Sequence, residues 1–175
     1  MTDSARLLQA VRTVPDFPEV GVQFKDITPI LADADLLLEA VDLLAQPYRD
    51  EGITKVVGIE ARGFILGSLL ARELGAGFVP IRKRGKLPYS THEESYDLEY
   101  GTDIIAMHTD AVSSNDRVLI HDDVIATGGT ASAAYRLVRH FNADAVGYSF
   151  LVELSFLNGR EKLNPGVPVH VVLPL

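Results

Sequence analysis

Residues 118–130, which read VLIHDDVIATGGT, constrain the fold of this chain more than any other segment. A short apolar run ends in two adjacent carboxylates, Asp122 and Asp123, and a turn of small residues leads into a helical pattern from Ala131. Glycines let backbone N–H groups approach an anion closely, and a helix N-terminus adds a favourable dipole. Carboxylates repel phosphate but accept hydrogen bonds from sugar hydroxyls. The order of strand, acidic pair, turn and helix therefore predicts a site for a phosphorylated sugar.

The alternative for this segment is a tight strand-to-helix turn at Gly128 and Gly129 that binds nothing, beside two solvated acidic side chains. Two observations favour the functional interpretation. Burying two adjacent carboxylates on a strand is costly unless something compensates their charge. Thr130 follows the glycines, and its hydroxyl can also donate a hydrogen bond to phosphate.

Length and composition indicate an ordinary globular protein. A chain of 175 residues favours one domain with a sizeable core, and its 47% hydrophobic and 23% charged residues are typical values. The net charge of −8 argues against a nucleic-acid partner or an anionic membrane surface, because both require a basic face. The sequence contains no cysteine, which excludes disulfides, thiolate catalysis and thiolate metal sites.

The expected location is the cytoplasm. The N-terminal segment is amphipathic and lacks the continuous apolar core of a signal peptide. No apolar run is long enough to span a bilayer, and Glu153 interrupts the most apolar stretch, residues 145–157.

The pattern of apolar residues predicts alternating strands and helices. Strands are expected at residues 55–59, 77–81, 104–107, 118–120, 145–152 and 169–173. Helices are expected at residues 4–13, from Asp33 or Asp35 to residue 48, at 63–74 and at 131–141. Residues 14–21 are expected to be irregular and residues 82–100 to form a long loop. This order implies an α/β fold with a largely parallel sheet, in which ligands bind at the carboxyl ends of the strands.

Two further segments follow predicted strands. In residues 58–67 (GIEARGFILG), Arg62 could hold a diphosphate by bidentate hydrogen bonds, and the alternative is a surface ion pair between Arg62 and Glu60. Residues 79–88 (VPIRKRGKLP) bring four cations within five positions, either as a solvated loop or as ligands of phosphate oxygens.

Residues 96–101 (YDLEYG) have two interpretations as well. Their alternation suits an edge strand, whereas a carboxylate on a mobile loop could exchange a proton with a bound base. The five histidines show no metal-ligand spacing and are expected at ordinary polar or core positions.

Residues 118–130 resemble the phosphoribosyl diphosphate (PRPP) motif of the type I phosphoribosyltransferases, and nearly the whole chain resembles the adenine branch of that family. The branch-level signals are FP and GVQFKDITP within residues 17–29, EARGF at 60–64, RKRGKLP at 82–88, YDLEYG at 96–101, and VEL at 152–154 with GR at 159–160. The resemblance implies a type I phosphoribosyltransferase fold: a mainly parallel central sheet flanked by helices, a small N-terminal hood and a flexible active-site loop. It also implies one domain over residues 1–175, with residues 1–30 contributing to a base-binding hood.

By resemblance, the expected reaction converts adenine and PRPP into AMP and diphosphate in a homodimer. Mg²⁺ is expected to bind through PRPP oxygens and water rather than directly through protein side chains. The resemblance implies these roles: 5′-phosphate binding by Ala126, Thr127, Gly128, Gly129 and Thr130; ribose binding by Asp122 and Asp123; diphosphate binding by Arg62, Arg82, Lys83 and Lys86; adenine binding by Gln23, Phe24 and Lys25; and proton transfer by Glu99.

One position departs from the family pattern, because His121 stands where a small aliphatic residue is more common. A histidine beside two aspartates either gains a raised pKa or stays neutral in the core. Two other functions remain open: a phosphoribosyltransferase for another purine such as xanthine or hypoxanthine, and a PRPP-sensing regulator without turnover.

Overall fold

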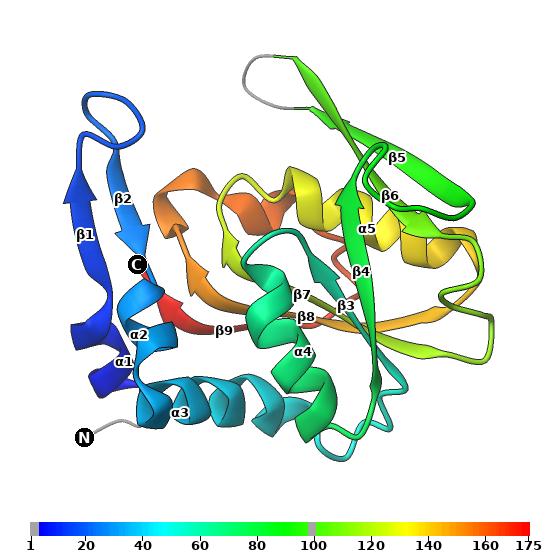
Figure 1. The fold of residues 1–175 in the computed structure, drawn as a ribbon, viewed down its shortest axis with the longest axis horizontal. Helices are drawn as coiled ribbons and strands as arrows, with labels where there is room; N and C mark the ends of the chain where they lie inside the picture. Colours follow the sequence, from blue (N-terminus) through cyan, green and yellow to red (C-terminus); the bar gives the residue numbers. More distant parts are fainter. Residues whose placement is uncertain (1–3, 98–100) are drawn as a thin grey trace.

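The computed structural model describes residues 4–97 and 101–175, and its centre is a seven-stranded sheet (Figure 1). The strand order is β5-β6-β4-β3-β7-β8-β9. Neighbouring strands from β4 to β9 are parallel, whereas β6 pairs antiparallel with both β4 and β5. The strand bounds are β3 Lys55–Ile59, β4 Gly77–Lys83, β5 Thr91–Asp97, β6 Thr102–His108, β7 Arg117–Ile125, β8 Asp144–Glu153 and β9 Val169–Pro174. The predicted α/β class with a mainly parallel sheet is confirmed.

Helices cover both faces of this sheet (Figure 1). Residues of α3 (Ala34–Ala45) and α4 (Gly63–Glu73) share one buried cluster, and those of α5 (Gly129–His140) belong to a second cluster. The shorter helices are α1 (Ala5–Ala10), α2 (Thr28–Ala32) and the 3-10 turns η1 (Gln46–Tyr48), η2 (Ser155–Leu157) and η3 (Gly159–Lys162). Among the described residues, no helix combines the length and hydropathy that crossing a membrane requires.

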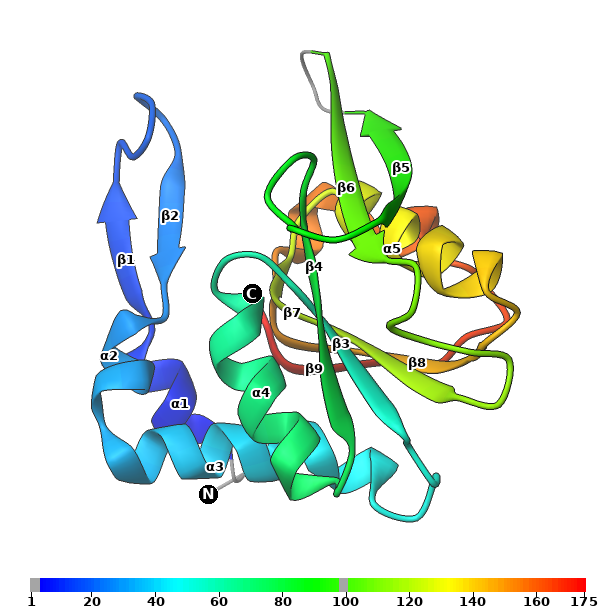
Figure 2. The same cartoon turned by 45° about the vertical axis from the view of Figure 1, so that its right-hand side comes forward.

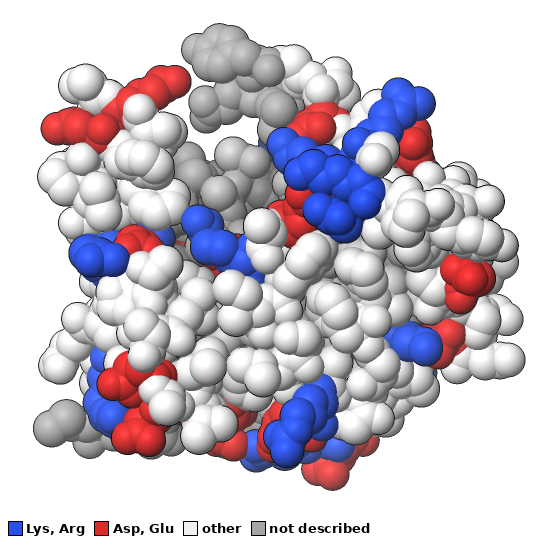
Figure 3. Space-filling view, viewed as in Figure 1, with Lys and Arg blue, Asp and Glu red and all other residues white. Residues whose placement is uncertain are grey.

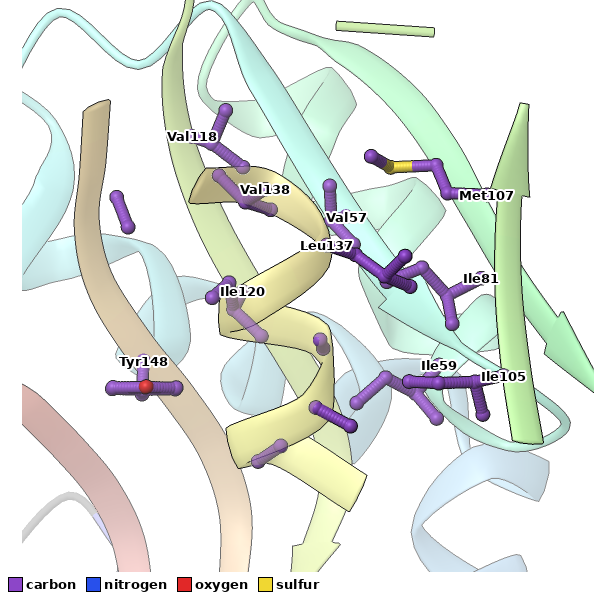
Figure 4. Packing of buried hydrophobic residues seen from close by; sticks show 14 of the residues in the cluster. Val57, Ile59, Ile81, Ile105, Met107, Val118, Ile120, Leu137, Val138 and Tyr148 are labelled. Carbon is purple, nitrogen blue, oxygen red and sulfur yellow. The ribbon is translucent and has the colours of Figure 1, made fainter. Parts of the chain in front are cut away.

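The two cores follow from the alternation of side chains along buried parallel strands. Val57 and Ile120 pack on the face with α5 (Figure 4), whereas the adjacent Val56 and Leu119 pack on the opposite face. All four side chains are fully buried. Strands that are covered on both faces read as continuous apolar runs, which is why the sequence pattern located β3 and β7.

A small hairpin stands to one side of the sheet (Figure 2) and forms the N-terminal hood. Strands β1 (Arg12–Pro15) and β2 (Gln23–Asp26) pair antiparallel as a separate two-stranded sheet. The predicted helix over residues 4–13 was correct at α1 but too long, because α1 ends at Ala10 and β1 begins at Arg12. The predicted irregular chain over residues 14–21 was wrong only for residues 14 and 15, which belong to β1. Pairing with a segment farther along the chain overrides the local pattern.

The predicted loop at residues 82–100 was also wrong in part. Strand β4 continues to Lys83, and residues 91–97 form β5, which pairs with β6 from Thr91↔His108 to Asp97↔Thr102. Nearly every β5 residue is half-buried rather than buried, so this edge strand tolerates polar residues on both faces. Polar composition therefore concealed the strand.

Candidate active site

The carboxyl ends of three adjacent parallel strands place the predicted site segments at one edge of the sheet. Strand β3 lies between β4 and β7 in the sheet order, so residues 60–63, 82–86 and 122–130 lie at or just after the carboxyl ends of neighbouring strands. Ligands in parallel sheets bind at this edge, because the loops after the strands diverge there.

The turn between β7 and α5 encloses a cavity of about 90 Å³. Ser132 N donates to Gly128 O at 3.0 Å, while among the described residues no side chain caps the start of α5. The first backbone N–H groups of a helix lack partners within the helix and attract anions. The cavity is lined by Asp122, Val124, Ile125, Ala126, Thr127, Gly128, Thr130 and Ala131.

The turn rests on a second segment, η3, through two glycines. Gly128 has a φ of +77°, and a Cβ there would lie 2.0 Å from the Gly159 carbonyl oxygen. A Cβ on Gly159 would in turn lie 2.2 Å from the Ala126 carbonyl oxygen. Only glycine fits at both positions, since any side chain would separate the two backbones.

An ion pair anchors the segment that supports the turn. Arg160 donates to both carboxylate oxygens of Glu153, from Nε and Nη2, each at 2.7 Å. Glu153 is buried at the end of β8. A bidentate pair of this kind fixes orientation as well as distance, so it holds Gly159 against residues 126–130, the turn predicted to bind phosphate (the phosphate turn).

The acidic pair occupies two different environments. Asp122 lines the cavity, and its Oδ1 accepts a hydrogen bond from Asp123 N at 2.9 Å. Burial, followed by the neighbouring Asp123 carboxylate, raises the pKa of Asp122 well above its ordinary value. Gly63, at the start of α4, packs against it so closely that a Cβ would lie 2.8 Å from Asp122 Oδ1.

Asp123 is only 4% exposed and forms a short ion pair with Arg62 Nε. The guanidinium of Arg62 also lies over the ring of Phe24, 5.4 Å from its centroid. Arg62 therefore links the acidic pair to the hood, which places residues predicted for ribose, diphosphate and base in one continuous site.

Glu60 organises the basic segment after β4. Its carboxylate accepts hydrogen bonds from Arg82 Nε and Lys83 N, each at 3.0 Å, and from Lys86 Nζ at 2.6 Å. Burial raises the pKa of Glu60, but these three donors outweigh burial and lower it below its ordinary value. The alternative Arg62–Glu60 pair is not formed, because Glu60 binds the basic segment and Arg62 binds Asp123.

The remaining cations of this segment are paired too. Lys83 Nζ contacts Asp103 Oδ2 at 2.8 Å, and Arg84 Nε contacts Glu93 Oε2 at 3.0 Å. Figure 3 shows basic and acidic side chains gathered together on the surface near the end of β4. An incoming anion must therefore exchange with carboxylates for these cations.

The hood presents residues 23–25 on strand β2. Phe24 packs edge-to-face on Phe17, with ring centroids 5.2 Å apart. Lys25 Nζ donates to Thr13 Oγ1 at 3.0 Å, and Gln23 is exposed at the start of the strand. Of these three side chains, Phe24 is the one that contacts Arg62, through the guanidinium that lies over its ring.

Comparisons with known proteins agree with this geometry. A family model described as a phosphoribosyl transferase domain matches residues 27–164. The adenine phosphoribosyltransferase of Solidesulfovibrio magneticus is 54% identical over 157 residues, covering 90% of this chain and 92% of the relative. The chain belongs to the phosphoribosyltransferase family, in its adenine branch. Among solved structures, adenine phosphoribosyltransferase from Rhodothermus marinus is 61% identical with a TM-score of 0.96 and covers 99% of each chain. The enzyme from Saccharomyces cerevisiae, complexed with adenine and an imino-altritol bisphosphate, is 39% identical with a TM-score of 0.92 and covers 98% of each chain.

Most residues predicted for this phosphoribosyltransferase site lie together. Four of the five residues assigned to the 5′-phosphate line the small cavity, and Gly129 lines an adjacent cavity of about 340 Å³ with Tyr96, Arg136 and Lys162. The predicted proton-transfer residue, Glu99, lies outside the described residues, so its role stays a prediction.

Sequence reasoning considered Glu60 only as the alternative surface partner of Arg62 and gave no individual role to Gly63 or Gly159. Each of them positions other site residues rather than facing the cavity. Glu60 and Gly63 flank Arg62 in the branch signal EARGF, and Gly159 belongs to the signal GR, so the motifs that mark the adenine branch contained them. Their partners lie 22 to 59 positions away along the chain, which no local pattern reveals.

His121 is fully buried on β7. Burial is the largest influence and lowers its pKa to about 4, although the Asp123 carboxylate acts in the opposite direction. Of the two alternatives, the structure supports the neutral core histidine.

Proposed function

We propose that this chain catalyses the transfer of the 5-phosphoribosyl group from PRPP to adenine, giving AMP and diphosphate. In this reaction the bond from the anomeric carbon to the diphosphate oxygen breaks and its electron pair leaves with diphosphate. A nitrogen of adenine then bonds to that carbon, and the base loses a proton. The observation that carries the proposal is the uncapped helix start at the phosphate turn, next to a carboxylate pair and a basic segment.

The phosphate turn holds the 5′-phosphate in this proposal. Residues 126–130 supply backbone N–H groups and the hydroxyls of Thr127 and Thr130 to its oxygens. Asp122 and Asp123 accept hydrogen bonds from the ribose hydroxyls. Fixing both ends of the sugar supports the oxocarbenium-like transition state, because the reacting carbon cannot drift while charge develops.

Arg62, Arg82, Lys83 and Lys86 bind the diphosphate. Each already has a carboxylate partner, so diphosphate replaces Asp123, Glu60 and Asp103 as the anion that these cations contact. Guanidinium groups suit this role, since they bind phosphate oxygens in a bidentate manner.

Mg²⁺ fits this donor set through PRPP oxygens and water. Asp122 lines the cavity, and carboxylates accept hydrogen bonds from the water molecules that Mg²⁺ retains. When bound, the ion neutralises charge on the leaving diphosphate.

The hood binds adenine. Phe24 offers an aromatic face beside Arg62, and in this proposal backbone groups of Gln23 and Lys25 read the base edge. Glu99 exchanges the proton of the base. Solved relatives from Saccharomyces cerevisiae and Giardia lamblia were crystallised with adenine and 9-deazaadenine, respectively, which supports this assignment.

We also propose that the chain acts as one domain, as a homodimer and in the cytoplasm, as the resemblance implies. Light scattering and cell fractionation test the last two statements.

A direct assay tests the function. The chain is incubated with PRPP, Mg²⁺ and, separately, adenine, guanine, hypoxanthine or xanthine, and nucleotide formation is followed by chromatography. We expect AMP from adenine and little product from the other bases. Product from hypoxanthine or xanthine instead would support the other purine specificity, and binding of PRPP without any turnover would support a regulator.

A further inference from the structure

Arg136 connects helix α5 to strand β5 by hydrogen bonds in three directions. Its guanidinium donates from Nε to Glu94 Oε2 at 3.0 Å and from Nη2 to the Ser95 carbonyl oxygen at 2.7 Å. A third bond, from Nη1 to Ser132 Oγ at 3.3 Å, holds the side chain on its own helix. Because the guanidinium is planar and rigid, these bonds fix the orientation of the strand as well as its distance from the helix.

Strand β5 lies along α5 on either side of Arg136. Toward the end of the helix, the rings of His92 and His140 stack with centroids 3.3 Å apart. Toward its start, a Cβ on Gly129 would lie 3.3 Å from the Asp97 carbonyl oxygen, so the end of β5 packs on the first helical residue. Gly129 belongs to the phosphate turn, and Arg136 follows it by about two helical turns. Arg136 therefore fixes β5 relative to the phosphate turn.

Strand β6 connects β5 to β4, which leads into the basic segment (Figure 1). Ile105 on β6 is the register partner of Glu94 on β5 and of Lys83 on β4, so the three residues form one row across three strands. Ile105 is buried, and Lys83 Nζ contacts Oδ2 of Asp103, also on β6, at 2.8 Å. The carboxylate that Arg136 binds thus belongs to the same row of the sheet as Lys83.

We propose that Arg136 is a positioning residue that sets the spacing between the phosphate turn and the basic segment by fixing β5 to α5. The inference rests on the proposed function, because in that function PRPP is the ligand that binds at both places. Its 5′-phosphate and its diphosphate are joined through one ribose ring, so covalent geometry limits their separation. The two subsites must match that separation for both ends to bind at once.

This spacing affects a ligand that binds at two points but not a ligand that binds at one. Once one end of PRPP is bound, the other end binds with an effective concentration that depends on where the second subsite lies. Ribose 5-phosphate uses only the phosphate turn and the acidic pair, whereas diphosphate uses only the cations. Loosening β5 from α5 should therefore weaken PRPP binding and leave the binding of both fragments nearly unchanged.

The alternative is a surface ion pair with no role in the site. The side chains of Arg136 and Glu94 are 44% and 26% exposed, and exposed pairs contribute little to stability. Removing such a pair would change the binding of none of the three ligands. Removing a pair that stabilises the whole fold would weaken all three together. A positioning role alone separates PRPP from its two fragments.

The variant Arg136→Gln tests the proposal, since it keeps a polar side chain and removes the guanidinium. Isothermal titration calorimetry of the full chain measures the affinity for PRPP with Mg²⁺, for ribose 5-phosphate, and for diphosphate with Mg²⁺. We expect PRPP to bind about three- to tenfold more weakly and each fragment to change by less than about twofold, because displacing one subsite is costly only for a ligand held at both ends.

Arg139→Gln is the matched control. Arg139 is an exposed arginine on the same helix, and it donates to the Ala143 carbonyl oxygen just beyond the end of that helix. The control changes the net charge by the same amount and should leave all three affinities unchanged.

Glu94→Gln removes the charge from the strand side of the same contact. We expect a smaller loss of PRPP affinity than in Arg136→Gln, and no further loss when both residues are changed, because the two variants break one connection. Unchanged PRPP binding in Arg136→Gln, equal weakening of PRPP and its fragments, or the same loss in Arg139→Gln would overturn the inference. PRPP binding and AMP synthesis by the unmodified chain test the proposed function separately.

Discussion

Replacing Gly159 with alanine tests whether the segment behind the phosphate turn determines its geometry. The added Cβ would lie 2.2 Å from the Ala126 carbonyl oxygen and 3.1 Å from Gly128 N, whereas ordinary contact begins near 3.4 Å. The turn must therefore retreat by roughly 1 Å. Gly159 itself does not line the cavity, so any effect on ligand binding is transmitted through the backbone of the turn.

The magnitude follows from the cost of overpacking, which is about 1–3 kcal/mol for an added group in a well-packed region. If the turn takes up this strain, the affinity for ribose 5-phosphate falls by about 5- to 150-fold, because 1.4 kcal/mol corresponds to a factor of ten. Strain energy that is instead spread over the whole fold lowers the melting temperature by about 2–4 °C for each kcal/mol.

Calorimetry with ribose 5-phosphate and with diphosphate, together with thermal unfolding, measures how much of the strain affects the turn and how much affects the whole fold. Gly159→Ala should bind ribose 5-phosphate weakly and diphosphate almost normally, since the basic segment is held by Glu60 rather than by η3. Gly166→Ala is the control, because the nearest atom to its added Cβ is the side-chain oxygen of Asn164 at 3.3 Å. Normal ribose 5-phosphate affinity with an unchanged melting temperature in Gly159→Ala would refute the reasoning.

Three further predictions concern individual side chains. Asp123→Asn should keep the fold and raise the KM for PRPP by about 10- to 100-fold, because a neutral amide accepts hydrogen bonds from the ribose hydroxyls less strongly than a carboxylate, and near-normal turnover at low PRPP would contradict this. Glu99→Ala should lower kcat by about 10²- to 10⁴-fold with a smaller change in PRPP affinity, and steady-state kinetics showing the reverse would reassign it to substrate binding. For His121, the pKa falls from 6.5 in the unfolded chain to about 4 in the folded chain, so protonation favours unfolding as pH falls through this window. Between pH 7 and pH 4, the free energy of unfolding measured in urea should therefore fall by roughly 3 kcal/mol less in His121→Val than in the parent. Identical pH profiles for the two proteins would show that His121 is not buried in its neutral form.

The core of the fold could be predicted because its strands are buried on both faces. The apolar runs at residues 55–59 and 145–152 have few other stable arrangements in a chain of this length, and helical spacing located α4 and α5. Strands β1 and β5 could not be found in this way. Both are exposed or half-exposed and carry polar residues, so their pairing partners rather than their composition define them.

The site residues likewise divide into those whose arrangement depends on neighbouring sequence and those whose arrangement depends on distant segments. The geometry of the turn between β7 and α5 could be predicted because strand, glycines and helix are contiguous in the sequence. The contacts of Arg62 and Glu60 could not, since each depends on which strands are neighbours in the sheet. Arg62 meets Asp123 because β3 lies beside β7, and Glu60 meets Arg82 because β3 also lies beside β4.

The paired cations explain how a chain with a net charge of −8 can hold a polyanionic substrate. Glu60, Asp103 and Asp123 keep arginine and lysine side chains ordered before any ligand arrives, which removes part of the entropy that binding would otherwise cost. In the proposed function the same carboxylates compete with diphosphate for those cations, so they limit its affinity. Removing these carboxylates would strengthen diphosphate binding only if the cations stayed in place. The contacts of Glu60 show why the cations would move, because this one carboxylate holds Arg82, Lys86 and the backbone of Lys83 together. Order and moderate affinity therefore arise from the same contacts, which suits an enzyme that must release diphosphate after each turnover.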